Sequence, residues 1–260
     1  MNIGERNELF LKIRLVMLRD SGTDHLGPFK IIESVGFDHC EYGKLPANFN
    51  LATLSLLDDD KLTQLSLSLN IRKAGGRSKS DVYINKKGYS VKSLASSPPA
   101  LVNHTCRPGF EFACRYAGVN IEELDKLVKE YWKLRKANVI GEDIKNNDQR
   151  SPFREAKHVL APILEYFLFN GTGAGLSDHP AEYIIDYSEP LDERTWVILD
   201  KRTAIDELWD RLIFCVRAKK GMPENYPHNR DKSKNESIAV WTEYSSEEYR
   251  GALHIRAITH

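Results

Sequence analysis

Apolar residues recur at helical spacing near the start of the chain. Leu9, Ile13, Val16 and Met17 lie three or four positions apart or side by side, which predicts an amphipathic helix from Glu5 to about Arg19. A second helix is predicted over DDDKLTQLSLSLN, because its acidic residues fall in the first turn, where the helix dipole favours them. Two more are predicted over NIEELDKLVKEYWKLRKA, with an Asn cap, and SPFREAKHVLAPILEYFLF, with a Ser cap followed by Pro.

Short runs of β-branched and aromatic residues predict strands between these helices. A β-hairpin is predicted where DVYI and YSVKSL flank NKKG, whose Gly suits a positive φ. Other strands are predicted at FEFACRY, AEYIIDY, RTWVILD, RLIFCVRAKK, SIAVWTEY and GALHIRAI. Loops are predicted at RKAGGRSKS, SLASSPPALVNHT, FNGTGAGLSDHP and GMPENYPHNRDKSKN, which are rich in turn formers. We therefore expect one α/β domain over 1–260, with a mixed β-sheet flanked by helices and a β-rich C-terminal part.

Composition indicates an enzyme-sized intracellular protein. The 260 residues are enough to bury a core without disulfides, and the four cysteines are scattered, without the CxxC spacing of a zinc or redox site. Charges interrupt the apolar stretch of the first 18 residues, so a signal peptide is not expected, and no later apolar run is long enough for a membrane span. We expect a cytoplasmic protein that does not contact membranes.

The charge is zero overall but is unevenly distributed. Residues 71–92 hold seven Lys and Arg side chains and the single acid Asp81, whereas residues 178–210 hold ten acids and three bases. A charged run is commonly just a solvated face. It is also the pattern expected around a cleft that binds a polyanion.

The predicted hairpin holds residues suited to phosphodiester chemistry. Asp81 begins its first strand and Lys92 ends its second, so the two side chains converge at one end of the sheet. Ser90 and Lys92 are two positions apart and therefore share a face. Hydrolysis of a phosphodiester requires oxygen ligands for a divalent cation and a positive group near the attacking water. A hairpin with a capping Asp and a surface Lys remains an alternative interpretation of the same pattern.

The order acid, hairpin, x, Lys resembles the signature of the PD-(D/E)xK nucleases, with Ser90 at the position of the second acid. Three stretches extend the resemblance: GERNE in the first helix, with Glu8 last; the basic, Gly-rich AGGRSKSD; and YSVKSLASSPPALVNHT after the lysine. The last two are similar to type II restriction endonucleases of the HpaII type, which cut CCGG. The resemblance is strongest over 75–118 and weaker over 1–19 and 166–223.

The resemblance implies roles for individual residues. Asp81 would be the carboxylate that holds Mg²⁺, together with the Val91 carbonyl, and Lys92 would orient or activate water beside the phosphate. Glu8 would act as an indirect ligand through water. Ser90 departs from the family pattern, and a hydroxyl is a poorer magnesium ligand than a carboxylate. We therefore expect an acid-poor site that holds one metal directly.

Candidate DNA contacts lie on both sides of the hairpin and further along the chain. Phosphate contacts are expected from basic residues near the hairpin and at the end of a later strand, and base contacts from polar residues of the loop after Lys92. The phosphate candidates are Arg72, Lys73, Arg77, Lys79, Arg217, Lys219 and Lys220. The base-reading candidates are Ser96, Ser97, Asn103, His104 and Thr105. A polar turn and a solvated loop remain alternative interpretations of these two groups.

Taken together, the residues and the resemblance predict a magnesium-dependent type II restriction endonuclease acting on double-stranded DNA. A structure-specific repair nuclease or resolvase, and a DNA-binding module with a degenerate site, are the alternatives. A palindromic target is compatible with a homodimer, although monomers of this fold also exist. A cognate DNA methyltransferase is expected as a genetic partner.

Overall fold

The computed structural model describes residues 1–22, 27–93, 100–218, 221–229 and 232–258, which form a mixed α/β protein divided into two compact units. The first unit contains the described residues up to Ser93 together with Asp178–Arg202. The second contains Ala100 to Ser177 and Thr203 to Ile258. Eight α-helices occur in the described part of the chain, and none of these is both long and apolar enough to cross a membrane.

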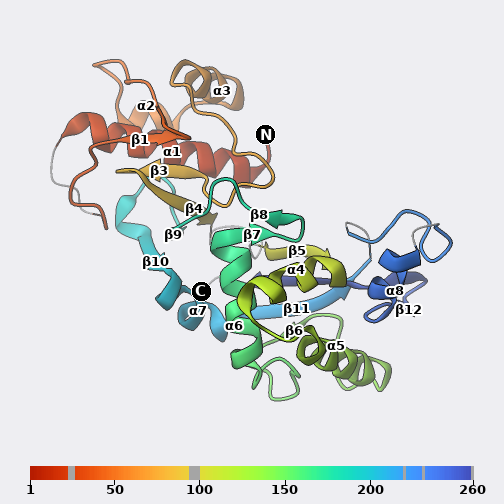
Figure 1. Ribbon diagram of the computed structural model, residues 1–260. Helices are drawn as coiled ribbons and strands as arrows, with labels where there is room; N and C mark the ends of the chain where they lie inside the picture. Colours follow the sequence, from red (N-terminus) through yellow and green to blue (C-terminus); the bar gives the residue numbers. More distant parts are fainter. Residues whose placement is uncertain (23–26, 94–99, 219–220, 230–231, 259–260) are drawn as a thin grey trace. The chain divides into compact units, whose positions relative to one another are not determined.

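A six-stranded mixed sheet forms the centre of the first unit (Figure 1). Its order is β10 (Trp196–Asp200), β9 (Tyr183–Tyr187), β4 (Lys87–Ser93), β3 (Val82–Ile84), β1 (Val35–Phe37) and β2 (Cys40–Glu41). Only β4 and β9 pair in parallel, and the other neighbours are antiparallel. The strands predicted at DVYI, YSVKSL, AEYIIDY and RTWVILD are confirmed.

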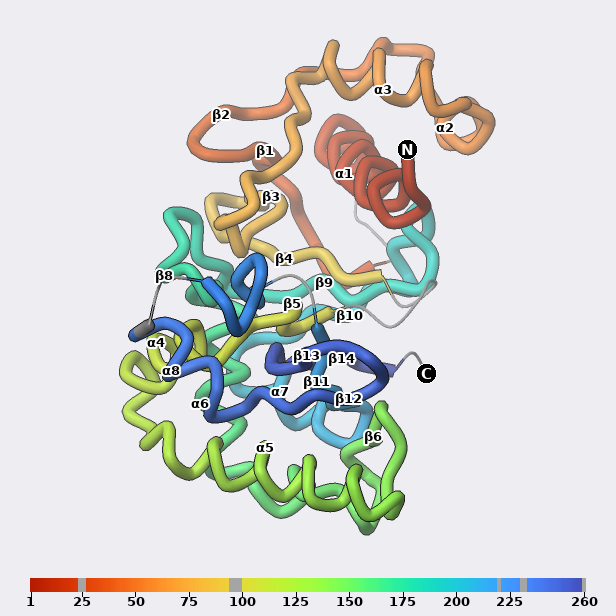
Figure 2. Tube along the Cα trace, turned by 90° about the vertical axis from the view of Figure 1, so that its right-hand side faces the viewer, coloured from red at the N-terminus to blue at the C-terminus, as the bar shows by residue number. Residues whose placement is uncertain are grey.

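Helix α1 (Ile3–Ser21) covers one face of this sheet. It begins with a capping box between Asn2 and Glu5 and ends at Gly22 in the left-handed region, so the predicted helix is confirmed. Figure 2 shows α1 between β4 and α3 (Asp59–Ser68), both of which contact it. The short helix α2 (Leu51–Ser55) precedes α3. Apolar residues of α1 and of one sheet face form a single buried cluster, which includes Leu11, Ile185 and Tyr187.

The turn of the hairpin differs from the prediction. Asn85 and Lys86 both have positive φ, which makes a tight two-residue connection, and the Asn85 side chain accepts hydrogen bonds from the backbone of Glu33 and Ser34. Gly88 therefore does not supply the positive φ. It lies inside β4, where an added Cβ would come within 2.3 Å of the Ser80 hydroxyl oxygen and 2.8 Å of the Pro180 carbonyl. Close approach of the chain segments explains this glycine.

The second unit contains a four-stranded antiparallel sheet in the order β5 (Ala100–Cys106), β14 (Ala252–Ala257), β11 (Leu212–Arg217) and β6 (Ile144–Lys145). Two small hairpins belong to the same unit: β7 (Gly171–Thr172) with β8 (Gly175–Leu176), and β12 (Glu243–Ser245) with β13 (Glu248–Arg250). The strands predicted at RLIFCVRAKK and GALHIRAI are confirmed.

Helices pack around this second sheet. Helix α4 (Arg107–Ala117) contacts β5, α5 (Ile121–Lys136), α6 (Lys157–Glu165) and α8 (Lys232–Ala239). A π-helical turn, Tyr166–Asn170, continues α6, and most of α7 (Lys201–Trp209) belongs to this unit. The Asn120 cap predicted for α5 is confirmed, because its side chain accepts a hydrogen bond from the Glu122 backbone.

The structure contradicts several predictions in this unit. FEFACRY lies in α4, where Phe110, Ala113 and Cys114 are buried at helical spacing. SIAVWTEY is not one strand, because α8 extends to Ala239 and only Glu243 onward is extended. The helix predicted from Ser151 begins only at Lys157, after a series of turns.

Candidate active site

Asp81 lies where β3 begins, and its carboxylate is fixed against β4. Its backbone N–H donates to the Tyr89 carbonyl (2.8 Å), and its Oδ2 accepts the Val91 N–H at 2.7 Å and the Ser90 hydroxyl at 3.3 Å. Pairing between β3 and β4 ends at Val82 and Tyr89. Strand β4 continues beyond the last residue of β3 that pairs with it, and there the Asp81 carboxylate takes the place of a backbone carbonyl in accepting the Val91 N–H.

The same edge of β4 offers a second oxygen. In a strand, the N–H and C=O of one residue point to the same side, so the Val91 carbonyl is directed to the side on which Asp81 accepts the Val91 N–H. A carboxylate and a backbone carbonyl suit Mg²⁺, which commonly keeps several waters and one or two protein carboxylates. Asp81 and Val91 thus form a fitting pair of donors for the predicted metal. No three His, Cys, Asp or Glu side chains gather into a metal cage among the described residues.

The segment before Asp81 is held by the backbone of another part of the first unit. The N–H groups of Lys79 and Ser80 both donate to the His179 carbonyl, at 3.0 and 2.9 Å. The Ser80 side chain is fully buried and donates to the Pro180 carbonyl at 2.7 Å. These bonds fix the chain on which Asp81 sits, so its position does not depend on the hairpin alone.

Lys92 lies on the face of the sheet opposite α1. Its neighbour Val91 packs in the cluster that contains α1, and strand alternation places Ser90 and Lys92 on the other face. The Lys92 side chain is half-buried, and none of the described residues forms an ion pair or hydrogen bond with its ammonium. An ammonium group in this situation is available to an anion from outside.

A second lysine is electrostatically coupled to this position. Burial lowers the pKa of Lys79 to about 8, and repulsion by Lys92 contributes in the same direction, whereas Asp81 opposes the shift. Lys79 therefore lies close enough to Lys92 and Asp81 for both charges to act on it.

Glu8 has a partner on its own helix. Its carboxylate accepts a 2.6 Å hydrogen bond from Lys12, which lies one turn further along α1 and is fully buried. Burial raises the pKa of Tyr187 to about 12, and the charges of Glu8 and Asp81 contribute in the same direction. Glu8, which reaches the sheet from α1, and Asp81 are therefore both close enough to Tyr187 for their charges to act on its phenol.

Sequence reasoning missed Asp186. It lies on β9 in register with Lys92 on the parallel strand β4, so the two side chains share a face. Only 6 % of Asp186 is exposed. A lone acid in the otherwise apolar strand YIIDY was the available signal, because a carboxylate is rarely buried without a specific reason. Asp186 adds a carboxylate to the face on which Ser90 replaces one.

The predicted phosphate contacts beside the hairpin are mostly exposed. Arg72, Lys73 and Arg77 are exposed, whereas Lys79 is half-buried. Arg72 donates to the Asn70 side chain at 3.2 Å, and Lys73 pairs with Glu5 at 2.6 Å. Exposed ion pairs contribute little to stability, so Lys73 is readily available to another anion.

The remaining predicted contacts belong to other parts of the structure. Asn103, His104 and Thr105 lie in strand β5 of the second unit, so the loop predicted for them was wrong. Arg217 ends β11, where it pairs with Asp143 at 3.3 Å. Four others fall outside the described residues: Ser96, Ser97, Lys219 and Lys220.

His254, a buried residue of β14, is expected to make stability depend on pH. Burial lowers its pKa to about 4, with further contributions from His104, Arg256 and Arg217. The unfolded chain binds this proton near pH 6.5, whereas the folded chain binds it only near pH 4. The resulting contribution to the unfolding free energy is therefore present above pH 6.5 and is lost as pH falls towards 4. Its full size is about 3 kcal/mol, at 1.36 kcal/mol per pKa unit. Urea unfolding at pH 7.5 and 4.5 measures this loss of unfolding free energy in wild type. The loss between the two pH values should be smaller in His254→Asn by the part that His254 contributes.

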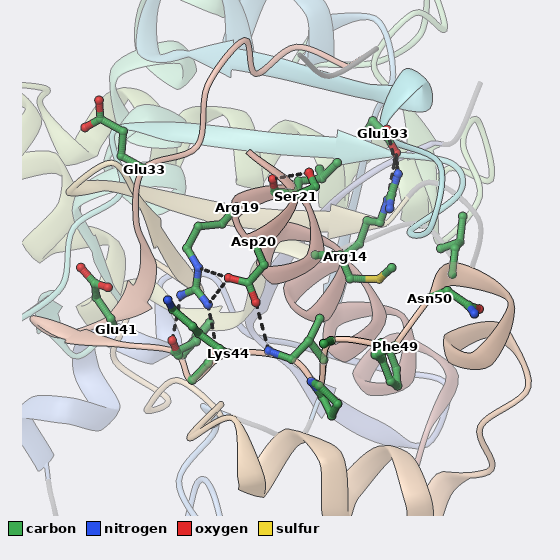
Figure 3. A pocket seen from close by; sticks show the side chains of 18 residues that line it. Arg14, Arg19, Asp20, Ser21, Glu33, Glu41, Lys44, Phe49, Asn50 and Glu193 are labelled. Carbon is green, nitrogen blue, oxygen red and sulfur yellow. Dashed lines mark hydrogen bonds and ion pairs between the residues drawn. The ribbon is translucent and has the colours of Figure 1, made fainter. Parts of the chain in front are cut away.

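A pocket of about 1050 Å³ is lined by other residues of the first unit (Figure 3). It lies beside the C-terminal half of α1. Arg14 is engaged by Glu193 through both carboxylate oxygens, and Arg19 donates to the carbonyls of Tyr42 and Gly43. Both arginines of this pocket are therefore occupied by partners within the protein. Neither Asp81 nor Lys92 lines the pocket.

No family model matches this chain, and neither the curated proteins nor the solved structures contain a match. The resemblance to restriction endonucleases therefore stays a prediction from the sequence motif, and the site must be argued from its own residues.

Proposed function

We propose that this chain is a magnesium-dependent type II restriction endonuclease, which hydrolyses phosphodiester bonds at a short sequence of double-stranded DNA. One observation carries most of the proposal. The half-buried Lys92 ammonium has no partner among the described residues, and Lys92 follows Val91, whose N–H donates a hydrogen bond to the Asp81 carboxylate. A cation and a carboxylate fixed to adjacent strands are the two protein parts that phosphodiester hydrolysis requires.

In this proposal the basic residues bind the phosphate, and Asp81 and the Val91 carbonyl bind the metal. Lys92, reinforced by Lys79, would bind non-bridging oxygens of the scissile phosphate and stabilise the negative charge that develops there. Asp81 and the Val91 carbonyl would hold Mg²⁺, which supplies Lewis-acid stabilisation of the phosphoryl oxygens. The Val91 N–H and Ser90 hydroxyl keep the Asp81 carboxylate oriented.

Incubation with plasmid DNA and magnesium tests the proposal. A restriction endonuclease yields discrete fragments with one common end sequence, and chelation of magnesium with EDTA stops the reaction. Preferential cutting of branched substrates would instead establish a structure-specific nuclease. A mobility shift of duplex DNA without any cleavage would establish a binding module. The second and third results each contradict the proposal.

A DNA-binding module is a second candidate, and it is favoured because the only carboxylate bound to the edge of β4 among the described residues is Asp81, whereas Asp186 lies on the next strand, β9. Ser90 carries no charge, and the Glu8 carboxylate is neutralised by Lys12. A site of this composition binds a divalent cation less strongly than one with two adjacent carboxylates. Cleavage that requires millimolar magnesium would reconcile this composition with the nuclease proposal.

Replacing Ser90 with alanine should leave cleavage largely intact. Its hydroxyl makes one neutral-donor hydrogen bond of 3.3 Å, so its loss should lower the unfolding free energy by about 1 kcal/mol. The stronger bond from the Val91 N–H continues to hold Asp81. Single-turnover rates and urea unfolding measure the two effects. A complete loss of cleavage in a folded Ser90→Ala protein would show that the hydroxyl itself participates in the reaction.

A further inference from the structure

Strand β5 contains a bulge at the residues predicted to read bases. The pairing of β14 with β5 shifts register around His254, so that Leu253 faces Thr105 whereas Ile255 faces Val102. His104 is the strained residue within the bulge, with φ of 41°. Positive φ is uncommon for residues other than glycine, and bulges often redirect a side chain.

Contacts with His254, within β5 itself and with Gly221 hold the bulge in place. The His104 N–H donates to Nδ1 of His254 at 3.4 Å, and the two imidazole rings meet edge to face with centroids 4.4 Å apart. The Thr105 hydroxyl donates to the Asn103 carbonyl at 3.3 Å. Gly221 passes so close to the His104 carbonyl that an added Cβ would lie 2.5 Å from its oxygen, and its φ is 99°.

The bulge changes which side chains of β5 reach solvent. Val102 and Cys106 are buried, whereas Asn103, between them, is exposed and His104 is half-buried. An exposed Asn on a rigid strand is preorganised for recognition, because little side-chain and backbone freedom remains to be lost on binding. Its amide offers both a donor and an acceptor, the pair that matches the N6 and N7 groups of adenine in the major groove.

We propose that this bulge is a base-reading element, in which Asn103 contacts base edges and His254 is the positioning residue that holds the bulge. The inference rests on the proposed function, since it requires DNA as the ligand. Arg217 is a weaker candidate for the same role, because Asp143 and the Cys215 sulfur already engage its guanidinium.

Three variants of the full chain test the positioning role. His254→Asn keeps an acceptor near the place of Nδ1, whereas His254→Leu is similar in size and has none. His158→Leu is the matched control, because His158 is an exposed residue of α6 in the same unit. Amide hydrogen exchange at His104 should be faster in His254→Leu than in wild type and unchanged in His254→Asn and His158→Leu. Equal exchange in all four proteins would overturn the role given to His254.

DNA selectivity tests the base-reading role. The probes are short duplexes carrying the sequence at which wild type cuts plasmid, and the same duplexes with one base pair changed. Asn103→Ala should reduce the preference for the intact sequence at one position by roughly 5- to 150-fold. His254→Leu should reduce it at the same position, and His254→Asn should restore it.

The outcomes separate this inference from the proposed function. If wild type cleaves and both Asn103→Ala and His254→Leu prefer the intact sequence as strongly as wild type does, the inference is overturned and the nuclease proposal stands. Failure of wild type to bind or cut any duplex overturns both the nuclease proposal and base reading. Faster His104 exchange in His254→Leu would then show only that the bulge is held as described.

Discussion

Replacing Asp81 with asparagine is expected to lower the single-turnover rate of DNA cleavage by roughly 10³-fold or more. Asparagine keeps an oxygen for the Val91 N–H, so the local structure should persist, but the negative charge needed to hold magnesium is removed. Loss of several kcal/mol of metal-assisted stabilisation corresponds to this factor, at 1.36 kcal/mol per tenfold. Quenched-flow or gel assays with enzyme in excess over DNA measure the rate directly.

The matched control is Asp200→Asn, which removes the same charge from the last residue of β10 in the same sheet. It should cleave at the wild-type rate. Thermal unfolding of both variants shows whether the fold is retained. Cleavage by a folded Asp81→Asn protein within tenfold of wild type would remove Asp81 from the proposed site.

The elements that sequence predicted correctly are those whose local signals agree with their surroundings. Helix α1 has a capping box, an apolar face and a terminal glycine, and each signal is independent of the rest of the chain. FEFACRY misled because Phe, Glu and Phe alternate as in a strand. The decisive signals are Pro108 near the start of α4 and Gly118 after its end, which bracket Phe110, Ala113 and Cys114 at helical spacing.

The hairpin part of the candidate site could be predicted because it is local. Asp81 and Ser90 are nine positions apart, and a two-residue turn is enough to bring them into contact. Asp186 could not be found in this way, because its position beside Lys92 depends on the parallel pairing of β4 with β9. A parallel neighbour is reached through a long crossover, and nothing in the intervening sequence states its register.

Glu8 illustrates a different limit. Its spacing within the first helix resembles that of a metal-site glutamate, and its role as an indirect ligand stays a prediction; the helical pattern gave no sign that Lys12 pairs with it. The fully buried Lys12 requires a counter-charge, since an unpaired buried ammonium is strongly disfavoured. The burial of Lys12 follows from tertiary packing of α1, which the polar and apolar pattern of one helix does not specify in enough detail.

Replacing Lys92 with methionine should lower the cleavage rate by roughly 10²- to 10³-fold while weakening DNA binding much less. The methionine keeps the length and apolar stem of the side chain, so the variant removes little besides the charge. Binding depends on many phosphate contacts, of which Lys92 contributes one, so the salt dependence of affinity should fall by about one unit of slope. Fluorescence anisotropy in EDTA measures binding separately from cleavage.

Two companion lysines make this a test of position and not only of charge. Lys86→Met removes an exposed charge from the turn of the same hairpin and should leave the rate unchanged. Lys79→Met should give an intermediate loss, because Lys79 is coupled electrostatically to Lys92 and Asp81 but lies before β3. Equal losses in all three variants would mean that the hairpin acts only as a basic surface. The graded order Lys92, Lys79, Lys86 is expected only if the transition-state charge develops beside the Asp81 carboxylate.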